Sequence, residues 1–360
     1  MRGKKKKHIV LFAVVCCFFL GAFSASCHFS ARRNGESDAG EETGGAALEF
    51  FAMDTFMRVE AYGEDGQADA AVKAAQEEVF RLEKLWAAGV DTGEIGQVNA
   101  RQGGKVSADT VALLTRAKEL HVLTGGAFDI SIYPLMRAWG FVDKQYRVPS
   151  AGELAGLLKM TDAMQVLVDE AGGTVEFGLE GMQIDLGGIA KGYASARIME
   201  IYREAGIMSG LVSLGGNVQA LGRKPDGSLW RIGVKDPAGG EDYLGILRVE
   251  DKAVVTSGGY ERYFVQDGVR YHHILDPATG YPADAGLLSV TVASGDGTLA
   301  DGLSTSLFIM GRERAVQFWR EHAEEFDMVL YTDEGELYVT EGIAEDFTTS
   351  FPVQIIKKEP

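Results

Sequence analysis

The stretch DLGGIAKGYASAR, residues 185–197, constrains the fold of this chain more than any other. An apolar run over Val175–Leu186 predicts a strand before it, and apolar spacing over Ala190–Ala205 predicts a helix after it. Glycines at such a junction let a ligand approach closely, and the free N–H groups of a helix start favour an anion. With Lys191 and Asp185 beside them, they favour a phosphate-bearing ligand. A plain glycine turn stays open, because neither the dinucleotide nor the P-loop pattern is matched.

The charge of the chain limits its partners. The 360 residues carry a formal charge of −17, which makes nucleic acid an unfavourable partner. An acidic protein that binds phosphate needs local compensation by a lysine, a helix start or a metal cation. We therefore expect no nucleic-acid partner.

The N-terminus has the pattern of an export signal. Lys4–Lys7 precede an apolar stretch over Ile9–Phe23, which is short for a membrane span, and small residues then precede Cys27. This predicts a lipoprotein-type signal peptide over residues 1–26 and a lipid anchor on Cys27 that holds the protein on a membrane, facing the periplasm or the cell exterior. Ser24 stands where such signals usually have leucine, so an uncleaved anchor and ordinary signal cleavage stay open. No cysteine follows Cys27, so we expect no disulfide in the folded part.

The remaining chain predicts one α+β domain. Residues 27–48 are polar and predict a flexible tether, and residues 49–356 a single domain of mixed sheets and helices with inserted loops. Strands and helices do not alternate strictly, which disfavours a doubly wound sheet. The first elements expected are a strand over Phe50–Ala61 and helices over Gln67–Trp86 and Val106–Thr124. Later strands are expected over Leu211–Asn217 and Trp230–Pro237.

Three further stretches carry side chains suited to chemistry. Asp129 lies in an otherwise apolar run, where a buried carboxylate needs a partner. His273 lies in a stretch rich in turn formers, and it is either part of a well-made loop or a general base. A helix over Thr298–Gly311, capped by Thr298, places Asp301 and Thr305 on one face. That pair could share a Mg²⁺ ion, or Asp301 could balance the helix dipole while Thr305 bonds to the preceding turn.

Taken together and in this order, these stretches resemble the ApbE family, the FAD:protein FMN transferases. The resemblance implies an exported enzyme that binds FAD and Mg²⁺, transfers FMN to a threonine or serine hydroxyl of a partner protein and releases AMP. The partners it implies are flavoprotein subunits of membrane electron-transfer complexes. The matching strings are GGAFD (125–129) with PL (134–135) and WGF (139–141), DLGGIAKGYA (185–194), SLGGN (213–217), TSG (256–258) with YERY (260–263), HHILDPATG (272–280) and ADGLST (300–305).

The resemblance also implies a role for individual residues. The Gly188 carbonyl, Asp301 and Thr305 would hold Mg²⁺, with Ser304 as an open question, and His273 would deprotonate the acceptor hydroxyl. The residues that would contact FAD are Met53, Ala127, Phe128, Asp129, Asp185, Lys191 and Leu275.

Two departures from the family pattern affect the binding pocket. The family's Met-Gly-Thr is Met53-Asp54-Thr55 here, and the loop Gly93–Asn99 also differs, so no site residue is assigned between Phe80 and Asn99. Neither departure affects the metal residues or His273. Two alternatives use the same pocket: an FAD pyrophosphatase that yields FMN and AMP, and a lipoprotein that binds FAD without chemistry.

Overall fold

The computed structural model describes residues 44–64, 66–89, 92–239 and 243–359. The expected signal peptide, Cys27 and most of the expected tether lie outside these residues. None of the helices in the described part of the chain is long and apolar enough to cross a membrane.

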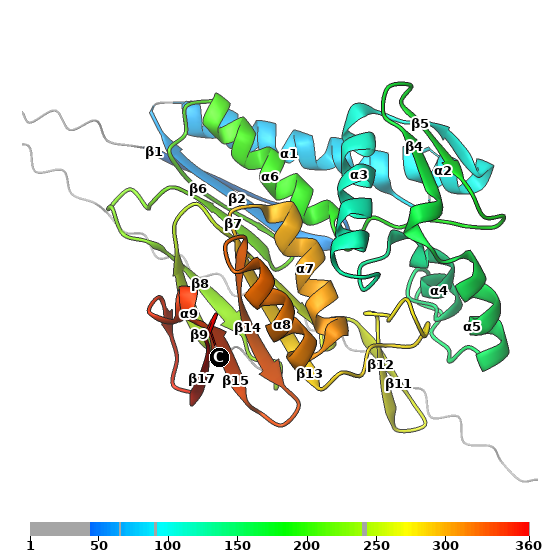
Figure 1. Cartoon of the computed structure of the whole chain (residues 1–360). Coiled ribbons are helices and arrows are strands. Elements are labelled where there is room, and N and C mark those ends of the chain that lie inside the picture. Colours follow the sequence, from blue (N-terminus) through cyan, green and yellow to red (C-terminus); the bar gives the residue numbers. More distant parts are fainter. Residues whose placement is uncertain (1–43, 65, 90–91, 240–242, 360) are drawn as a thin grey trace, which may run out of the picture. The chain divides into compact units, whose positions relative to one another are not determined.

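A nine-stranded sheet is the centre of the described domain (Figure 1). Its neighbouring strands pair antiparallel, except for the last two, which are parallel. In spatial order the strands are β1 (Gly44–Ala52), β2 (Thr55–Gly63), β6 (Ser209–Leu214), β7 (Asn217–Leu221), β10 (Ala253–Gly258), β13 (Leu287–Ser294), β14 (Phe326–Thr332), β15 (Leu337–Thr340) and β17 (Val353–Ile356).

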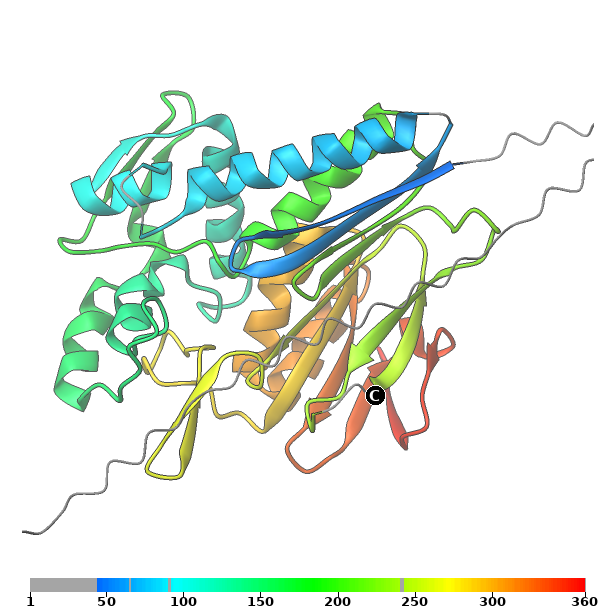
Figure 2. The ribbon, with the colours of Figure 1, turned by 180° about the vertical axis from the view of Figure 1, so that it is seen from behind.

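Helices cover one face of this sheet, and a small second sheet covers part of the other (Figure 2). Alternate residues of the strands face the helices, and burying each valine or leucine there contributes about 1.5–3 kcal/mol. On the opposite face Trp230 and Leu247 pack with Val254 of β10. The covering helices are α1 (Gln67–Trp86), α6 (Ala190–Glu204), α7 (Gly297–Met310) and α8 (Arg312–His322). The opposite layer contains β8 (Trp230–Lys235), β9 (Tyr243–Val249), α9 (Glu341–Ala344) and β16 (Phe347–Thr348).

Two smaller groups of elements extend the domain beside the helices. The second of these groups is held together by an apolar cluster of Leu135, Trp139, Phe141 and Leu275. The first group contains α2 (Glu94–Arg101), β3 (Gly103–Lys105), α3 (Ala108–Leu123), β4 (Val166–Asp169) and β5 (Thr174–Phe177). The second contains α4 (Tyr133–Ala138), α5 (Ala151–Leu157), β11 (Tyr263–Gln266) and β12 (Val269–His272), with 3₁₀ turns at Ile130–Ile132, Leu158–Met160 and Ala163–Gln165. The expected α+β architecture is confirmed.

The first strand prediction is wrong, because Phe50–Ala61 forms a hairpin instead of one strand. Met53 and Asp54 form its two-residue turn at φ of 47° and 58°, and Asp tolerates this left-handed conformation better than most residues. No glycine or proline marks the turn in the sequence. Strand β1 also begins at Gly44, so the last five residues of the expected tether, 44–48, belong to the sheet.

Two other expectations also need correction. The strand expected over Val175–Leu186 ends at Phe177, and the chain then forms irregular backbone until α6. The helix expected over Thr298–Gly311 is present as α7, but its N-cap is Asp296, whose carboxylate accepts from the N–H groups of Thr298 and Leu299 at 2.9 and 3.0 Å. The helices expected over Gln67–Trp86 and Ala190–Ala205 are confirmed as α1 and α6.

Helices α6 and α7 approach each other at Gly192. A Cβ atom at this position would lie 2.3 Å from the Gly297 carbonyl oxygen and 2.6 Å from the Asp301 Cβ. Both obstacles belong to the partner helix and cannot rotate away. Only glycine therefore allows the two helices to pack at this distance.

We predict that Gly192→Ala lowers the free energy of unfolding by about 1–3 kcal/mol through overpacking. Gly152→Ala is the matched control, because a Cβ at this position in α5 meets nothing within 4 Å, and loss of a helical glycine stabilises by about 0.5–1 kcal/mol. Urea titration of both variants measures the difference. Equal midpoints for Gly192→Ala and the wild type would contradict the close approach.

Candidate active site

The start of α6 presents a lysine and several exposed backbone groups. The preceding loop is fixed by the Asp185 N–H, which donates to the Ile130 carbonyl at 2.8 Å, and by the Asp185 carboxylate, which accepts from the Gly187 N–H at 2.7 Å. The Lys191 ammonium lies 3.4 Å from the Gly187 carbonyl oxygen. The residue before the helix is Ile189, which offers no side-chain cap, so the helix start depends on partners elsewhere in the chain.

Asp301 supplies one of these partners. Its Oδ2 atom accepts from the Gly192 N–H at 2.7 Å. In a regular helix that N–H would donate to the carbonyl four residues earlier, at Gly188. No hydrogen bond reaches the Gly188 carbonyl oxygen from any residue that the structure describes. The Gly192 N–H thus donates to a carboxylate of α7 instead of closing the first turn, and the Gly188 carbonyl oxygen is left to accept from a ligand.

Further oxygen and amide groups surround Asp301. Asn217 at the start of β7 is 1% exposed, and neither atom of its amide has a hydrogen-bond partner within the described residues. It still lies close enough to Asp301 to lower the pKa of that carboxyl. The Ser257 hydroxyl lies 2.7 Å from that of Ser304 and 3.2 Å from that of Thr305. A buried amide without a partner, next to a carboxylate and hydroxyls, is typical of a binding site.

The two buried carboxyl groups of the site, Asp185 and Asp301, have raised pKa values. Burial raises the pKa of Asp185, and the Gly187 N–H, Arg262 and Lys191 oppose the rise. Burial likewise raises the pKa of Asp301, and Lys191, the Gly192 N–H and Asn217 oppose it. Lys191 thus favours the ionised form of both carboxylates. A cation held by Asp301 would reinforce the charged form of this carboxylate.

His273 follows β12 and is anchored to Arg262. Its backbone N–H donates to the Arg262 carbonyl at 3.1 Å, and its Nδ1 atom lies 3.2 Å from the same oxygen. A carbonyl oxygen only accepts, so Nδ1 carries the hydrogen and Nε2 keeps the lone pair. Burial lowers the pKa of His273, and the Arg262 guanidinium lowers it further, although part of the ring remains exposed. The imidazole is therefore neutral at pH 7, and the lone pair of Nε2 is free to accept a hydrogen bond.

The other residues expected to contact FAD lie in different surroundings. Phe128 packs on the glycine loop, since a Cβ at Gly188 would lie 3.3 Å from its ring, and Ala127 is buried beside it. Met53 lies in the β1–β2 turn, where its N–H donates to Glu83 at 2.6 Å. Leu275 is 1% exposed, so its side chain belongs to the apolar cluster around Trp139.

Asp129 has all the partners a buried carboxylate needs. Its Oδ1 accepts from the Ser131 N–H at 2.7 Å, and its Oδ2 accepts from the Ala163 N–H at 3.1 Å and lies 3.3 Å from His121. These bonds hold the chain that carries Phe128 against the glycine loop. The structure thus accounts for this carboxylate without a ligand.

Sequence reasoning assigned no role to two residues that the structure places at the site. Asn217 begins β7 and Ser257 is the last residue but one of β10, within the matched strings SLGGN and TSG. Antiparallel pairing of Val255 with Asn217 brings these strands to the same edge of the sheet. A polar residue at the end of an apolar strand was the only available signal.

The metal question depends on oxygen atoms. Within the described residues no group of three or more His, Cys, Asp or Glu side chains gathers in a way that could hold an ion. The expected set contains one carboxylate, one carbonyl and one hydroxyl, all of them oxygen ligands of the kind that Mg²⁺ prefers. Whether these three oxygen atoms can bind one ion depends on their positions around Asp301.

Comparison with known proteins places this site in a family. The sequence profile described as "ApbE family" matches residues 53–330, which is most of the chain. The chain belongs to the ApbE family. This range includes every candidate residue of the site.

Two curated relatives and one solved structure show how close the likeness is. A protein of Klebsiella pneumoniae named "FAD:protein FMN transferase" is 37% identical over 69% of this chain and 76% of its own length. A protein of Treponema pallidum with the same name is 36% identical over 74% of this chain and 79% of its own. The crystal structure of the ApbE protein from Thermotoga maritima superimposes with a TM-score of 0.79 at 35% identity, covering 84% of this chain and 99% of that one.

We predict that the His273 imidazole of this ApbE-family protein stays neutral at pH 6, a pH at which a free histidine is mostly charged. Burial and Arg262 both disfavour the imidazolium, so its pKa lies below the ordinary value of about 6.5. NMR titration of the ring nitrogens, with His273→Gln to assign the signal, measures this. A midpoint at or above 6.5 would contradict the environment described for His273.

Proposed function

We propose that this protein transfers FMN from FAD to a threonine or serine hydroxyl of an acceptor protein, in a Mg²⁺-dependent reaction that releases AMP. Membership of the ApbE family makes it a flavin transferase, whose relatives are named FAD:protein FMN transferases. The observation that carries the finer proposal is the bond from the Gly192 N–H to the Asp301 carboxylate, which leaves the Gly188 carbonyl oxygen without a hydrogen bond among the described residues, one residue from Gly187, whose carbonyl oxygen lies 3.4 Å from the Lys191 ammonium. These are the groups that a pyrophosphate and its cation need.

The residues present fit a Mg²⁺ ion. The Gly188 carbonyl, Asp301 and Thr305 would hold it, and the buried amide of Asn217 lies next to Asp301. We do not include Ser304 among the metal ligands, because its hydroxyl donates to the Asp301 carbonyl at 2.8 Å. When bound, Mg²⁺ neutralises charge on a pyrophosphate and makes its phosphoanhydride easier to break.

The chain's own groups bind and orient the donor. Lys191 contributes a positive charge, and its backbone N–H, which has no hydrogen-bond partner among the described residues, lies in the first turn of α6, where a phosphate oxygen is favoured. Phe128 packs against the glycine loop and so fixes the backbone that approaches the ligand. Arg262 and Lys191 counteract the rise in the pKa of Asp185 that burial causes, and so favour its ionised form. The carboxylate then offers an acceptor for a hydroxyl or amino group of the nucleotide.

His273 is the general base of the proposed reaction. Its neutral Nε2 accepts the proton of the acceptor hydroxyl, whose oxygen forms a bond to the FMN phosphorus. The phosphoanhydride bond breaks at the same phosphorus, and its electron pair leaves with AMP. The Arg262 carbonyl keeps the imidazole in the tautomer that this step requires.

The setting of the reaction follows from the N-terminal sequence. The basic and apolar residues before Cys27 support a lipid-anchored protein outside the cytoplasm. The acceptors would then be flavoprotein subunits of membrane electron-transfer complexes, reached from the same side of the membrane. Mass spectrometry of the N-terminal peptide, which would carry lipid on Cys27, tests the anchor.

We predict that the purified protein adds FMN to a threonine-containing acceptor domain when supplied with FAD and Mg²⁺. His273→Ala should lower the rate of transfer by about 10²–10⁴-fold and leave FAD binding unchanged, since the base acts on the acceptor hydroxyl. His322→Ala, a change near the end of α8, is the matched control and should retain the rate. Mass spectrometry of the acceptor and quantification of AMP measure the outcome.

Two results would contradict the proposal in different ways. Free FMN and AMP without a gain of mass on the acceptor would make the protein an FAD pyrophosphatase. Stable FAD binding without release of AMP would make it a binding protein.

A further inference from the structure

Three consecutive residues of α6 point in three directions. Lys191 lies at the candidate site, Gly192 packs on α7, and Tyr193 reaches toward α1 and α3. Successive residues of a helix are about 100° apart, so the direction of Tyr193 determines that of Lys191. Whatever holds Tyr193 therefore also sets the position of the lysine.

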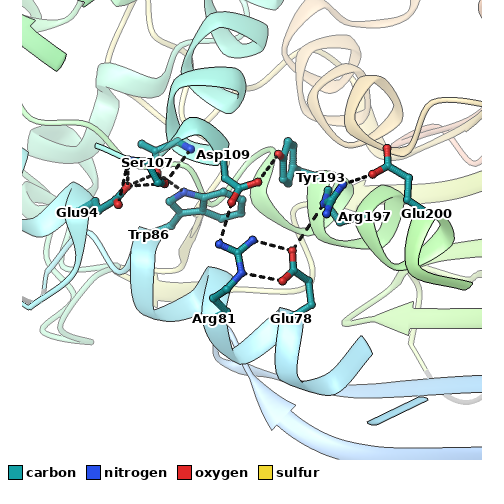
Figure 3. Close-up of polar contacts among 10 residues, drawn as sticks. Glu78, Arg81, Trp86, Glu94, Ser107, Asp109, Tyr193, Arg197 and Glu200 are labelled. Atoms are coloured by element: carbon teal, nitrogen blue, oxygen red, sulfur yellow. Dashed lines mark hydrogen bonds and ion pairs between the residues drawn. The ribbon is translucent and has the colours of Figure 1, made fainter. Parts of the chain in front are cut away.

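Tyr193 is held by a polar network that joins three helices (Figure 3). Its hydroxyl donates to Asp109 Oδ1, in the first turn of α3, at 3.0 Å. The other oxygen of Asp109 lies 2.8 Å from an Arg81 nitrogen in α1. Arg81 is in turn clamped by both oxygens of Glu78, at 2.7 Å each. The network thus links α6 to α3 and α1 through one tyrosine hydroxyl.

Apolar contact and the next helical turn support the same link. The Tyr193 ring meets the Trp86 ring edge to face, with centroids 5.3 Å apart. Trp86 is itself fixed, since its Nε1 donates to the Thr110 hydroxyl at 2.9 Å. One turn further along α6, Arg197 lies 3.7 Å from Glu78. The ring packing would survive loss of the hydroxyl, so the hydrogen bond can be tested separately.

The charges in the network define the donor and the acceptor. Burial raises the pKa of Tyr193, and the hydrogen bond to Asp109 raises it further, so the phenol keeps its hydrogen at neutral pH. Burial would also raise the pKa of Asp109, but the hydrogen bonds from Arg81 and Tyr193 outweigh it and lower that pKa. Asp109 is therefore ionised, and a hydrogen bond to an ionised acceptor is stronger than one between neutral groups.

We propose that Tyr193, through its hydrogen bond to Asp109, is a positioning residue that sets the start of α6 for binding the pyrophosphate of the donor. This inference deepens the proposed function and rests on it. Tyr193 touches no reacting atom, and it acts through Lys191. Two hydrogen bonds then fix the start of α6 from two sides, one from Gly192 to Asp301 and one from Tyr193 to Asp109.

Tyr202 provides the matched control on the same helix. Its ring is fully buried in the core, and its hydroxyl has no hydrogen-bond partner in the described part of the chain. Tyr202→Phe therefore removes a hydroxyl from α6 without removing a link to α3. A loss of affinity in Tyr193→Phe alone is therefore due to the broken hydrogen bond to Asp109 and not to the absence of a hydroxyl group on α6.

The test compares Tyr193→Phe, Tyr202→Phe, Lys191→Met and the double variant Tyr193→Phe/Lys191→Met. Calorimetric titration with FAD in the presence of Mg²⁺ measures affinity, and thermal unfolding without FAD measures stability. Tyr193→Phe should weaken FAD binding on the order of tenfold, which corresponds to about 1.4 kcal/mol. Tyr202→Phe should bind FAD as the wild type does. In the Lys191→Met background, Tyr193→Phe should change the affinity by less than about twofold, because the lysine that it positions is absent.

Three outcomes are informative in different ways. Wild-type affinity in Tyr193→Phe, even with a lower melting temperature, would show a role in stability alone and overturn the inference. Equal losses in both backgrounds would show that the hydroxyl does not act through Lys191, which also overturns it. Absence of FAD binding by the wild-type protein would instead refute the proposed function, and the inference with it.

Discussion

The hydrogen bond between the Gly192 N–H and the Asp301 carboxylate is the interaction on which the site depends. It takes the donor that would have closed the first turn of α6 and so leaves the Gly188 carbonyl oxygen without this partner. It also brings a buried carboxylate to a helix start, where positive potential stabilises it. Only glycine at position 192 permits the approach, because a Cβ would lie 2.3 Å from the Gly297 carbonyl oxygen. Close helix packing and ligand-binding geometry are therefore the same feature of this protein.

The rest of the fold supplies the surroundings of that contact. The sheet places the start of β7 and the end of β10 at one edge, so that Asn217 and Ser257 lie near α7. Tyr193 and Asp109 fix the opposite side of α6. The segment after the β11–β12 hairpin adds His273, whose Nε2 is kept free by the Arg262 carbonyl. The groups that we propose for donor binding, for cation binding and as the base thus come from separate segments, each with its own structural support.

Much of this arrangement could be predicted from the sequence where one residue type dictates the local structure. The helical spacing and Gly311 predicted α7, and the apolar spacing predicted α6 together with the position of Lys191 at its start. The turn at Met53 and Asp54 could not be predicted, because a single Asp beside Met, without glycine, asparagine or proline, is a weak turn signal. The role of Asn217 was also hidden, since its significance comes from having no partner in the fold. Likewise, Asp129 could be predicted to need partners, but the identity of Ala163 and His121 depends on tertiary contacts.

The most direct test of this account is a crystal structure of the protein with FAD and Mn²⁺, in which anomalous scattering locates the ion. We expect one ion bound by the Gly188 carbonyl oxygen, the Asp301 carboxylate and the Thr305 hydroxyl, at the distances of roughly 2.1 Å that small divalent cations require. The Lys191 ammonium should contact a phosphate oxygen of FAD in the same crystal. An ion bound elsewhere, or a Gly188 carbonyl turned away from Asp301, would contradict the account.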